Sequence, residues 1–449
     1  MTLLGVGLVF LCFVLEDTTI RAYGFIFYFV QLFYAAYILL KLENNYKYFF
    51  SPSFITILYI SVTFGLGHLV VANDIGMDKT YYTRFLNYES ISFITAYFLL
   101  CNMIVFLTIP FKKLSSTSLV YEESKIEKKT FKVLLFFGLL IAFSFIKIDL
   151  SFIGGSGDFS YSVKLVLAIF LVFFCRSYNI KIRFLLYSLI LFLIVLGNFE
   201  SKREIFFILI LFIFHEIVIN RITIKLVFKQ VILSFLTIMI GFYIVILSSI
   251  ARGYGQFDSE NIIDSAKFVI EYLNSETIYD GLAANFELSY SYGNSSNAMN
   301  YIYSGQEELL FGSTFLKIFF IPIPRSIFSS KPRSMLDIYA SVVSPRYRSN
   351  EGGSFPIVVY SELFWNFHLF GLLLLFLLFR YFNQIYIYIL KKIIINELTI
   401  KSVFYVSLYV TLIQFVRGSG LELWLLYALV AIPFTWFLTL INKIRFNHK

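Results

Sequence analysis

VILSFLTIMIGFYIVILSSI, Val231–Ile250, is a run of twenty residues without a charged side chain. A helix of this length measures about 30 Å, which matches the hydrocarbon thickness of a typical bilayer. Within lipid, a single segment satisfies all of its backbone polar groups only as a helix. The run therefore predicts a transmembrane helix.

The rest of the chain repeats this pattern. Of its 449 residues, 59% are hydrophobic and 14% are charged, whereas soluble domains are nearer half and a quarter. Eleven further runs are Thr2–Leu15, Tyr23–Leu40, Ser53–Ala72, Glu89–Pro110, Phe131–Ile148, Ser162–Cys175, Phe184–Gly197, Ile205–Asn220, Val358–Tyr381, Ser402–Val416 and Leu421–Ile441. The sequence predicts an all-α polytopic membrane protein with about twelve transmembrane helices.

The distribution of Lys and Arg predicts how these helices are oriented. With a cytoplasmic N-terminus, the inner loops hold about twenty Lys and Arg, and the short outer loops about eight. Both termini are therefore expected in the cytoplasm. Asn383–Lys401 mixes apolar and basic residues and predicts a cytoplasmic interfacial helix. The net charge of +9 reflects these inner loops, so no nucleic-acid partner is expected.

One connection is much longer than the others. It divides the chain into an N-terminal transmembrane bundle (1–250, about nine spans), an extracytoplasmic loop (251–357) and C-terminal transmembrane helices (358–449, about three spans). A loop of this length is usually functional or partly folded. Asp264–Asn274 has the spacing of an amphipathic helix, and Phe315–Ile323 is apolar but too short to span. The loop is therefore predicted to be partly helical.

Several cations fall where the charge distribution disfavours them. Arg203, Arg252, Arg325, Lys331 and Arg417 all lie near the predicted outer membrane–water boundary. Arg binds phosphate oxygens in a bidentate manner and Lys adds a point charge, so the set predicts a site for a lipid-linked phosphate or pyrophosphate. For any one of these residues, the alternative is a side chain that reaches for lipid headgroups.

Other polar residues extend this candidate site. Glu362 and Asn366 are four residues apart and share a helix face. Glu362 is interpreted either as a base or acceptor-binding group, or as the partner of an arginine. Asp280, Glu287 and Tyr339 offer carboxylates and a ring to a glycan, although Tyr also favours membrane interfaces.

Several chemistries are disfavoured by the residues that the chain lacks. It has no P-loop, no dinucleotide-binding glycine pattern and no metal-ligand cluster, so neither a cofactor nor a metal is expected. None of the four histidines lies in the long loop: His68, His215, His368 and His448. A histidine-centred reaction outside the membrane is therefore not expected.

The chain resembles the bacterial O-antigen (oligosaccharide repeat-unit) polymerases of the Wzy family. The likeness covers the topology, and it is sharper in IPIPRSIFSSKP (Ile321–Pro332), GGSFPIVVYSELFWNFHLFG (Gly352–Gly371) and FVRGSG (Phe415–Gly420). Members of that family often carry Pro-Arg followed by Lys-Pro, then a Gly-Ser-Phe-Pro entry, then Arg-Gly. Ser419 stands where an acidic residue is typical, which leaves the charge partner of Arg417 open.

The resemblance implies a function. Such enzymes transfer a growing glycan from undecaprenyl pyrophosphate onto a new lipid-linked repeat unit, on the outer face of the inner membrane. They use no nucleotide sugar and no required metal. Arg325, Lys331 and Arg417 would bind the pyrophosphate, and Glu362 and Glu287 are candidates for orienting or deprotonating the acceptor. A chain-length regulator and a flippase are possible partners.

Two alternatives share parts of this pattern. An O-antigen ligase, which moves glycan to lipid A core, has the same topology and donor but typically a functional His in its long loop. A flippase of lipid-linked oligosaccharides has a similar number of spans but only short loops. The long loop without His favours the polymerase over both.

Overall fold

The structure is a computed structural model. It describes residues 1–72, 90–116, 130–144, 160–176, 178–197, 202–225, 265–275, 288–320, 331–345, 355–395, 399–418 and 421–443, and in addition 239, 242–243, 246–247, 250, 278, 323, 327–328 and 330. Within these ranges the ordered elements are helices, and no strand is present. The predicted all-α class is confirmed for this part of the chain.

The described helices have the following bounds. The longer ones are α1 (Thr2–Val14), α2 (Asp17–Leu40), α4 (Pro52–Ala72), α6 (Ile91–Leu107), α8 (Thr130–Ser144), α9 (Ser160–Cys175), α10 (Ile180–Gly197), α11 (Lys202–Asn220), α16 (Leu288–Tyr303), α21 (Gly371–Ile395), α22 (Ile400–Val410) and α24 (Leu421–Lys443). The shorter ones are α3 (Tyr46–Phe49), α7 (Phe111–Ser116), η3 (Ala266–Phe268), α14 (Val269–Leu273), α17 (Ser313–Leu316), η4 (Lys317–Phe320), α18 (Met335–Val343), α20 (Val359–Phe367), η5 (His368–Phe370) and α23 (Leu412–Arg417).

Among the described residues, three segments are long and apolar enough to cross a membrane: Asp17–Leu40, Pro52–Val70 and Val359–Lys392. Other apolar helices, such as α1, α6 and α9, are shorter than about 18 residues. A bilayer requires about 17–25 residues. The count of about twelve transmembrane helices therefore stays a prediction.

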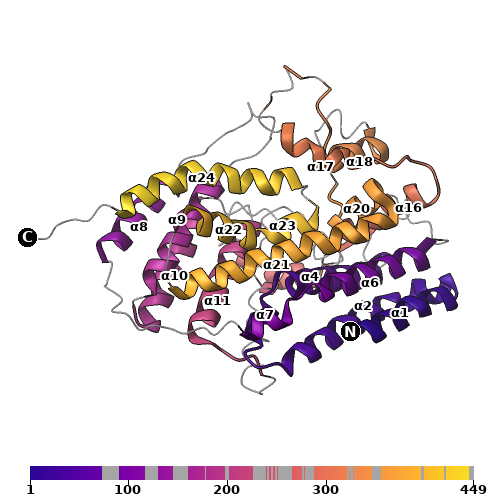
Figure 1. Cartoon of the computed structure of the whole chain (residues 1–449), viewed down its shortest axis with the longest axis horizontal. Helices are drawn as coiled ribbons and strands as arrows, with labels where there is room; N and C mark the ends of the chain where they lie inside the picture. The colour runs from indigo at the N-terminus through magenta and orange to yellow at the C-terminus, as the bar shows by residue number, and fades with distance from the viewer. Residues whose placement is uncertain are drawn as a thin grey trace, which may run out of the picture.

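The long helices form two groups that the C-terminal helices join (Figure 1). α1, α2, α4 and α6 pack together in one group, and α8, α9, α10 and α11 form the other. α21 contacts α4 and α6, whereas α22 and α24 contact α9. The C-terminal helices therefore belong to the same core as the N-terminal ones.

One end of the bundle gathers the α2–α4 turn, the segment after α6 and the end of α11, and we call it the basic end. Asn45 Nδ2 donates to the Ile224 carbonyl at 2.7 Å, and Ile224 N donates back to Asn45 Oδ1 at 2.8 Å. Lys47 Nζ donates to the Leu114 carbonyl at 3.2 Å, and the Tyr386 hydroxyl donates to the Lys47 carbonyl at 2.9 Å. These turns include the loops whose Lys and Arg predict a cytoplasmic side.

The opposite end, which we call the loop end, joins the starts of α2 and α6 to the end of α16. The Asp17 carboxylate accepts hydrogen bonds from the backbone and side chain of Ser92. Ser90 Oγ donates to Asn300 Oδ1 at 2.8 Å. Because α2, α4 and α6 each connect the two ends, they alternate in direction as the predicted spans do.

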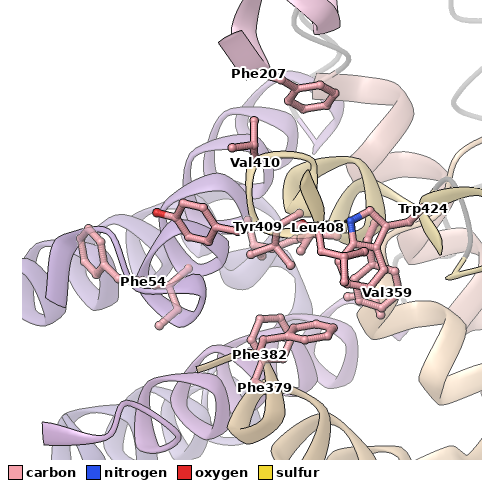
Figure 2. Close-up of a cluster of buried hydrophobic side chains, with 14 of the residues drawn as sticks. Phe54, Phe207, Val359, Phe379, Phe382, Leu408, Tyr409, Val410 and Trp424 are labelled. Carbon is pink, nitrogen blue, oxygen red and sulfur yellow. Dashed lines mark hydrogen bonds between the residues drawn. The ribbon is translucent and has the colours of Figure 1, made fainter. Parts of the chain in front are cut away.

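A cluster of buried apolar side chains lies where the C-terminal helices meet (Figure 2). The rings of Phe382 and Trp424 have centroids 5.3 Å apart, and Phe415 lies 5.1 Å from the same indole. Trp424 Nε1 donates to the Leu408 carbonyl at 3.2 Å, so the buried indole N–H has a partner. These contacts fix α21, α22, α23 and α24 against one another.

A buried polar network crosses the first helical group. Asn102 Nδ2 donates to Gln31 Oε1 and Ser61 Oγ, both at 3.1 Å, and Asn102 Oδ1 accepts from the Tyr360 hydroxyl at 3.1 Å. An amide left unpaired in such an interior would cost several kcal/mol. The network therefore specifies the register of α2, α4, α6 and α20.

The tenth predicted span, Val358–Tyr381, falls within Val359–Lys392, which is long and apolar enough to cross a membrane, but this segment is divided into α20, η5 and α21. Tyr360, at the start of α20, bonds to Asn102 in the second half of α6. Phe364, further along α20, packs against Phe93 near the start of α6, with ring centroids 5.8 Å apart. α20 therefore runs back toward the loop end before η5 reverses the chain. His368 has a φ of 50° at this reversal.

α21 then runs to the basic end. A Cβ on its first residue, Gly371, would lie 2.7 Å from the Leu363 carbonyl oxygen, so only glycine allows the hairpin to be this tight. α21 continues to Ile395, so the interfacial helix predicted over Asn383–Lys401 is largely an extension of α21. The eleventh predicted span, Ser402–Val416, is divided into α22 and α23.

The long loop contributes to the core. The helix predicted over Asp264–Asn274 is confirmed as η3 followed by α14. The first residues of the short apolar segment Phe315–Ile323 belong to α17 and η4. α16 was not predicted, and it packs against α4 and α20. Tyr292 of α16 is fully buried, and its hydroxyl lies 2.8 Å from His68 Nδ1. This part of residues 251–357 is therefore integrated with the bundle.

Candidate functional site

Two of the three stretches that carry the resemblance are in backbone contact. Gly418, which follows α23, has a φ of +104°, and a Cβ there would lie 1.7 Å from the Ile357 carbonyl oxygen. The third stretch begins at Ile321, directly after η4, and η4 contacts α24. Residues about 60 positions apart therefore meet at the start of α20, and the helix that precedes the third stretch contacts α24.

Arg417 is the last residue of α23 and is half-buried. Gly418 N donates to the Phe415 carbonyl at 3.0 Å, so a left-handed glycine ends the helix and directs the chain toward α24. Ile357 precedes α20, whose Tyr360 bonds to Asn102, so Arg417 lies next to the start of α20; its depth relative to the outer boundary stays a prediction.

Lys331 is buried, with 6% of its surface exposed. Its Nζ donates to the Ile323 carbonyl at 3.2 Å, and its backbone N donates to the Phe328 carbonyl at 3.2 Å. These two bonds join Lys331 to Ile323 and Phe328 within Ile321–Pro332, which we call the Pro-rich stretch. Next to it, Ser334 caps α18 by accepting from Asp337 N at 3.2 Å.

Glu362 and Asn366 lie on one face of α20, as their spacing predicted, and both are buried. Glu362 Oε1 accepts from Thr314 Oγ1 at 2.9 Å. Asn366 Nδ2 donates to Thr314 Oγ1 at 3.0 Å, and Asn366 Oδ1 accepts from Gly312 N at 3.1 Å. This face therefore holds α17, the segment that leads into η4 and the Pro-rich stretch.

Tyr339 of α18 is fully buried. Its hydroxyl donates to Asn294 Oδ1 at 3.2 Å and accepts from Asn297 Nδ2 at 3.1 Å, which joins α18 to α16. Its ring stands edge-on to Trp365, with centroids 6.2 Å apart. In this arrangement the ring contacts protein and is not free to stack on a sugar.

α16 supplies a polar surface to the same region. Ser295 Oγ accepts from Val358 N at 3.0 Å, and Ser361 Oγ donates to the Ser295 carbonyl at 3.0 Å. Both contacts lie at the start of α20, close to the meeting point of Ile357 and Gly418. The signal for this helix was present in the sequence as Ser and Asn at helical spacing, but that composition is also typical of loops.

The remaining predicted site residues are placed only in part. Arg203 belongs to the first turn of α11, and its side chain lies outside the description. Four others lie outside the described residues: Arg252, Asp280, Glu287 and Arg325. Within the described ranges, no group of three His, Cys, Asp or Glu side chains is close enough to hold a metal ion.

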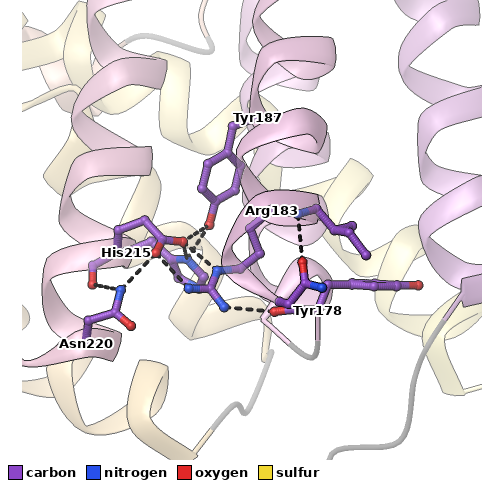
Figure 3. A network of polar contacts seen from close by, with 8 residues as sticks. Tyr178, Arg183, Tyr187, His215 and Asn220 are labelled. Carbon is purple, nitrogen blue, oxygen red and sulfur yellow. Dashed lines mark hydrogen bonds and ion pairs between the residues drawn. The ribbon is translucent and has the colours of Figure 1, made fainter.

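A second polar cluster, between α10 and α11, was missed by the sequence reasoning (Figure 3). Arg183 binds Glu216 in a bidentate manner, with Nε–Oε1 at 2.7 Å and Nη2–Oε2 at 2.8 Å. Tyr187 donates to Glu216 Oε1 at 2.8 Å and lies 2.8 Å from His215 Nδ1, and Asn220 donates to Oε2 at 2.9 Å. With its carboxylate so fully bonded, this cluster fits a structural clamp.

No protein-family model, curated protein or solved structure matches the chain.

Proposed function

We propose that the chain is a membrane-embedded glycosyltransferase that polymerises undecaprenyl-pyrophosphate-linked oligosaccharide repeat units on the extracytoplasmic face of the bacterial inner membrane. A hydroxyl oxygen of the acceptor repeat bonds to the anomeric carbon of the growing glycan. The bond from that carbon to the pyrophosphate oxygen breaks, and the hydroxyl proton passes to a base or to the released phosphate. Undecaprenyl pyrophosphate is the leaving group.

One observation carries the proposal. The stretches Gly352–Gly371 and Phe415–Gly420, chosen on resemblance alone, touch through Ile357 and Gly418. Such a contact is expected where separated motifs serve one site. α17 and η4, which precede the Pro-rich stretch, are held against the same α20 hairpin through Thr314.

In this proposal Arg417 stabilises the departing pyrophosphate. Negative charge grows on the leaving oxygen as the bond breaks, and preorganised cations lower that barrier. Arg417 lies next to the start of α20, where the contact between Gly418 and Ile357 fixes the neighbouring backbone. Arg325 and Lys331 lie in the stretch that follows η4, and Arg252 and Arg203 are the further candidate cations.

Glu362 is assigned a positioning role. It is 2% exposed and receives a hydrogen bond from Thr314, so it acts through the segment that it holds. Glu287 then remains the candidate base and Asp280 a candidate for contact with the glycan, whereas the buried Asn366 and Tyr339 are proposed to support the glycan site through the helices that they join. The proposal includes about twelve spans, with cytoplasmic termini.

Deletion of the gene, with surface polysaccharide resolved by size, tests the proposal in the host. We expect only single repeats on lipid A core, and restoration of the ladder by the wild-type gene. Arg417→Ala and Arg325→Ala should not restore it, although both proteins reach normal levels in the membrane. Lys391→Ala, which changes an exposed cation at the other end of α21, is the matched control and should restore the ladder.

Three outcomes contradict the proposal. Long glycan that accumulates on undecaprenyl pyrophosphate after deletion indicates a ligase. Repeat units trapped on the cytoplasmic face indicate a flippase. Normal ladders from both arginine variants exclude the pyrophosphate site assigned to Arg325 and Arg417.

A further inference from the structure

A cavity of about 440 Å³ opens at the basic end of the bundle, away from the site described above. Its walls are the turn after α6, the first residues of α7 and one face of α21. Phe376, Arg380, Gln384 and Ile387 line it from α21, and their spacing places them on a single helix face.

Buried hydrogen bonds fix the shape of this cavity. Asn383, next to Gln384, donates through Nδ2 to the Thr108 carbonyl at 3.1 Å, to Thr108 Oγ1 at 3.0 Å and to Ser53 Oγ at 2.7 Å. The turn that forms one wall is therefore tied to the helix that forms the other. On the far side, Phe111 stacks on Tyr48 with ring centroids 5.6 Å apart.

The lining of the cavity is strongly basic. Lys112, Lys113 and Arg380 all belong to it, Gln384 adds an amide, and none of the lining residues that the structure describes is acidic. Three cations around one hollow attract an anion, and a guanidinium beside ammonium groups suits phosphate oxygens. The turn's Thr108 contributes a further polar group.

An apolar strip leads out of the cavity toward the loop end. Leu373 and Leu377 are 50% and 52% exposed, and they continue the face of α21 that carries Arg380. Leu107, which lines the cavity from α6, is 48% exposed. A ligand with an anionic head and an apolar tail would match both parts, whereas a free anion would use only the first.

We propose that this cavity binds the headgroup of an anionic phospholipid, whose acyl chain lies along Leu373 and Leu377. The phosphate is held by Lys112, Lys113 and Arg380. The basic end carries the loops predicted to be cytoplasmic, and anionic lipids attract such clusters by about 1 kcal/mol for each cation. The site is separate from the proposed pyrophosphate site and does not depend on it.

Native mass spectrometry of the purified full-length chain tests the proposal. Phosphatidylglycerol, phosphatidylcholine and inorganic phosphate are each titrated into the detergent-solubilised protein. We expect one tightly retained phosphatidylglycerol, with weaker binding of phosphatidylcholine and of phosphate. Arg380→Gln should weaken phosphatidylglycerol binding about fivefold, and the triple variant with Lys112→Gln and Lys113→Gln on the order of a hundredfold.

The control is Lys391→Gln, which removes an exposed cation of the same helix outside the cavity and should leave the affinity unchanged. All of the substituted side chains are exposed, so the variants should fold, and unchanged thermal unfolding verifies this. Equal affinity for the two lipids, or equal losses in Arg380→Gln and Lys391→Gln, would overturn the proposal. Phosphate that binds as tightly as phosphatidylglycerol would show a site for a soluble anion instead.

Discussion

Gly418→Ala is the perturbation that bears most sharply on the proposed site. The residue joins Arg417 to α24 and has a φ of +104°, which L side chains rarely adopt. Its α-carbon faces the Ile357 carbonyl so closely that an added Cβ would lie 1.7 Å from the oxygen. The substitution therefore acts on the contact between the two stretches.

The size of the effect follows from this geometry. Ordinary contact begins at 3.4 Å, so the two backbones must separate by about 1.7 Å. Moving a catalytic group by about 1 Å costs on the order of a hundredfold in rate. The positive φ adds about 1–2 kcal/mol of conformational strain. We expect polymerisation to fall at least a hundredfold while the protein remains in the membrane.

Two glycines separate these contributions. Gly305 also has a positive φ, +70°, but nothing lies within 4 Å of a Cβ there, so Gly305→Ala carries strain without a clash. Gly138 lies inside α8 with open space around it, so Gly138→Ala carries neither. The assay is the size distribution of surface glycan after complementation, with membrane levels and thermal unfolding measured in parallel.

Two outcomes would contradict the role given to the contact between Gly418 and Ile357. If Gly418→Ala supports a wild-type ladder, the contact between Gly418 and Ile357 does not position a catalytic group. If Gly305→Ala loses the ladder to the same extent, strain rather than displacement explains the defect.

The other predictions concern Glu362 and the buried ion pair. Glu362→Gln keeps an oxygen that can accept a hydrogen bond from Thr314, so this variant should retain the ladder. Glu362→Ala and Thr314→Val remove that hydrogen bond and should lose the ladder. Loss of the ladder in Glu362→Gln would indicate that Glu362 acts as a base instead. Glu216→Gln leaves the buried Arg183 without its carboxylate and should lower the free energy of unfolding by about 3–5 kcal/mol. Tyr187→Phe removes hydrogen bonds to Glu216 and His215 but no charge, and should cost only about 2 kcal/mol, measured by thermal unfolding of the full chain. Equal losses in the last two variants would contradict the clamp.

Apolar runs in the sequence predicted most of the helices. Tyr23–Leu40 and Ser53–Ala72 correspond to α2 and α4, because length and hydropathy together leave a helix as the only structure that fits. α16 was not predicted, because its composition does not indicate a helix. Its Ser and Asn residues are typical of loops, and only tertiary partners such as Val358 and Tyr339 show why they are buried in a helix.

The direction of α20 could not be predicted from hydropathy. Val358–Tyr381 is apolar on average although it includes Glu362, Asn366 and Arg380, and the mean hydropathy of a segment is the same whether the chain crosses once or turns back. The reversal depends on the backbone at His368 and on the close approach of Gly371 to Leu363. For the site, the i, i+4 spacing predicted that Glu362 and Asn366 share a face, but not that Thr314 would bridge them.

Reconstitution tests whether the chain alone polymerises lipid-linked repeat units. Purified full-length protein in vesicles is supplied with lipid-linked repeat units extracted from the deletion strain, without nucleotide sugar. We expect glycans in whole multiples of the repeat on undecaprenyl pyrophosphate, with one free undecaprenyl pyrophosphate released per linkage. Membrane vesicles from the wild-type host are the positive control. If these vesicles polymerise the repeats but the reconstituted protein leaves them single, the proposed polymerase activity is contradicted. Transfer only to added lipid A core would contradict it as well.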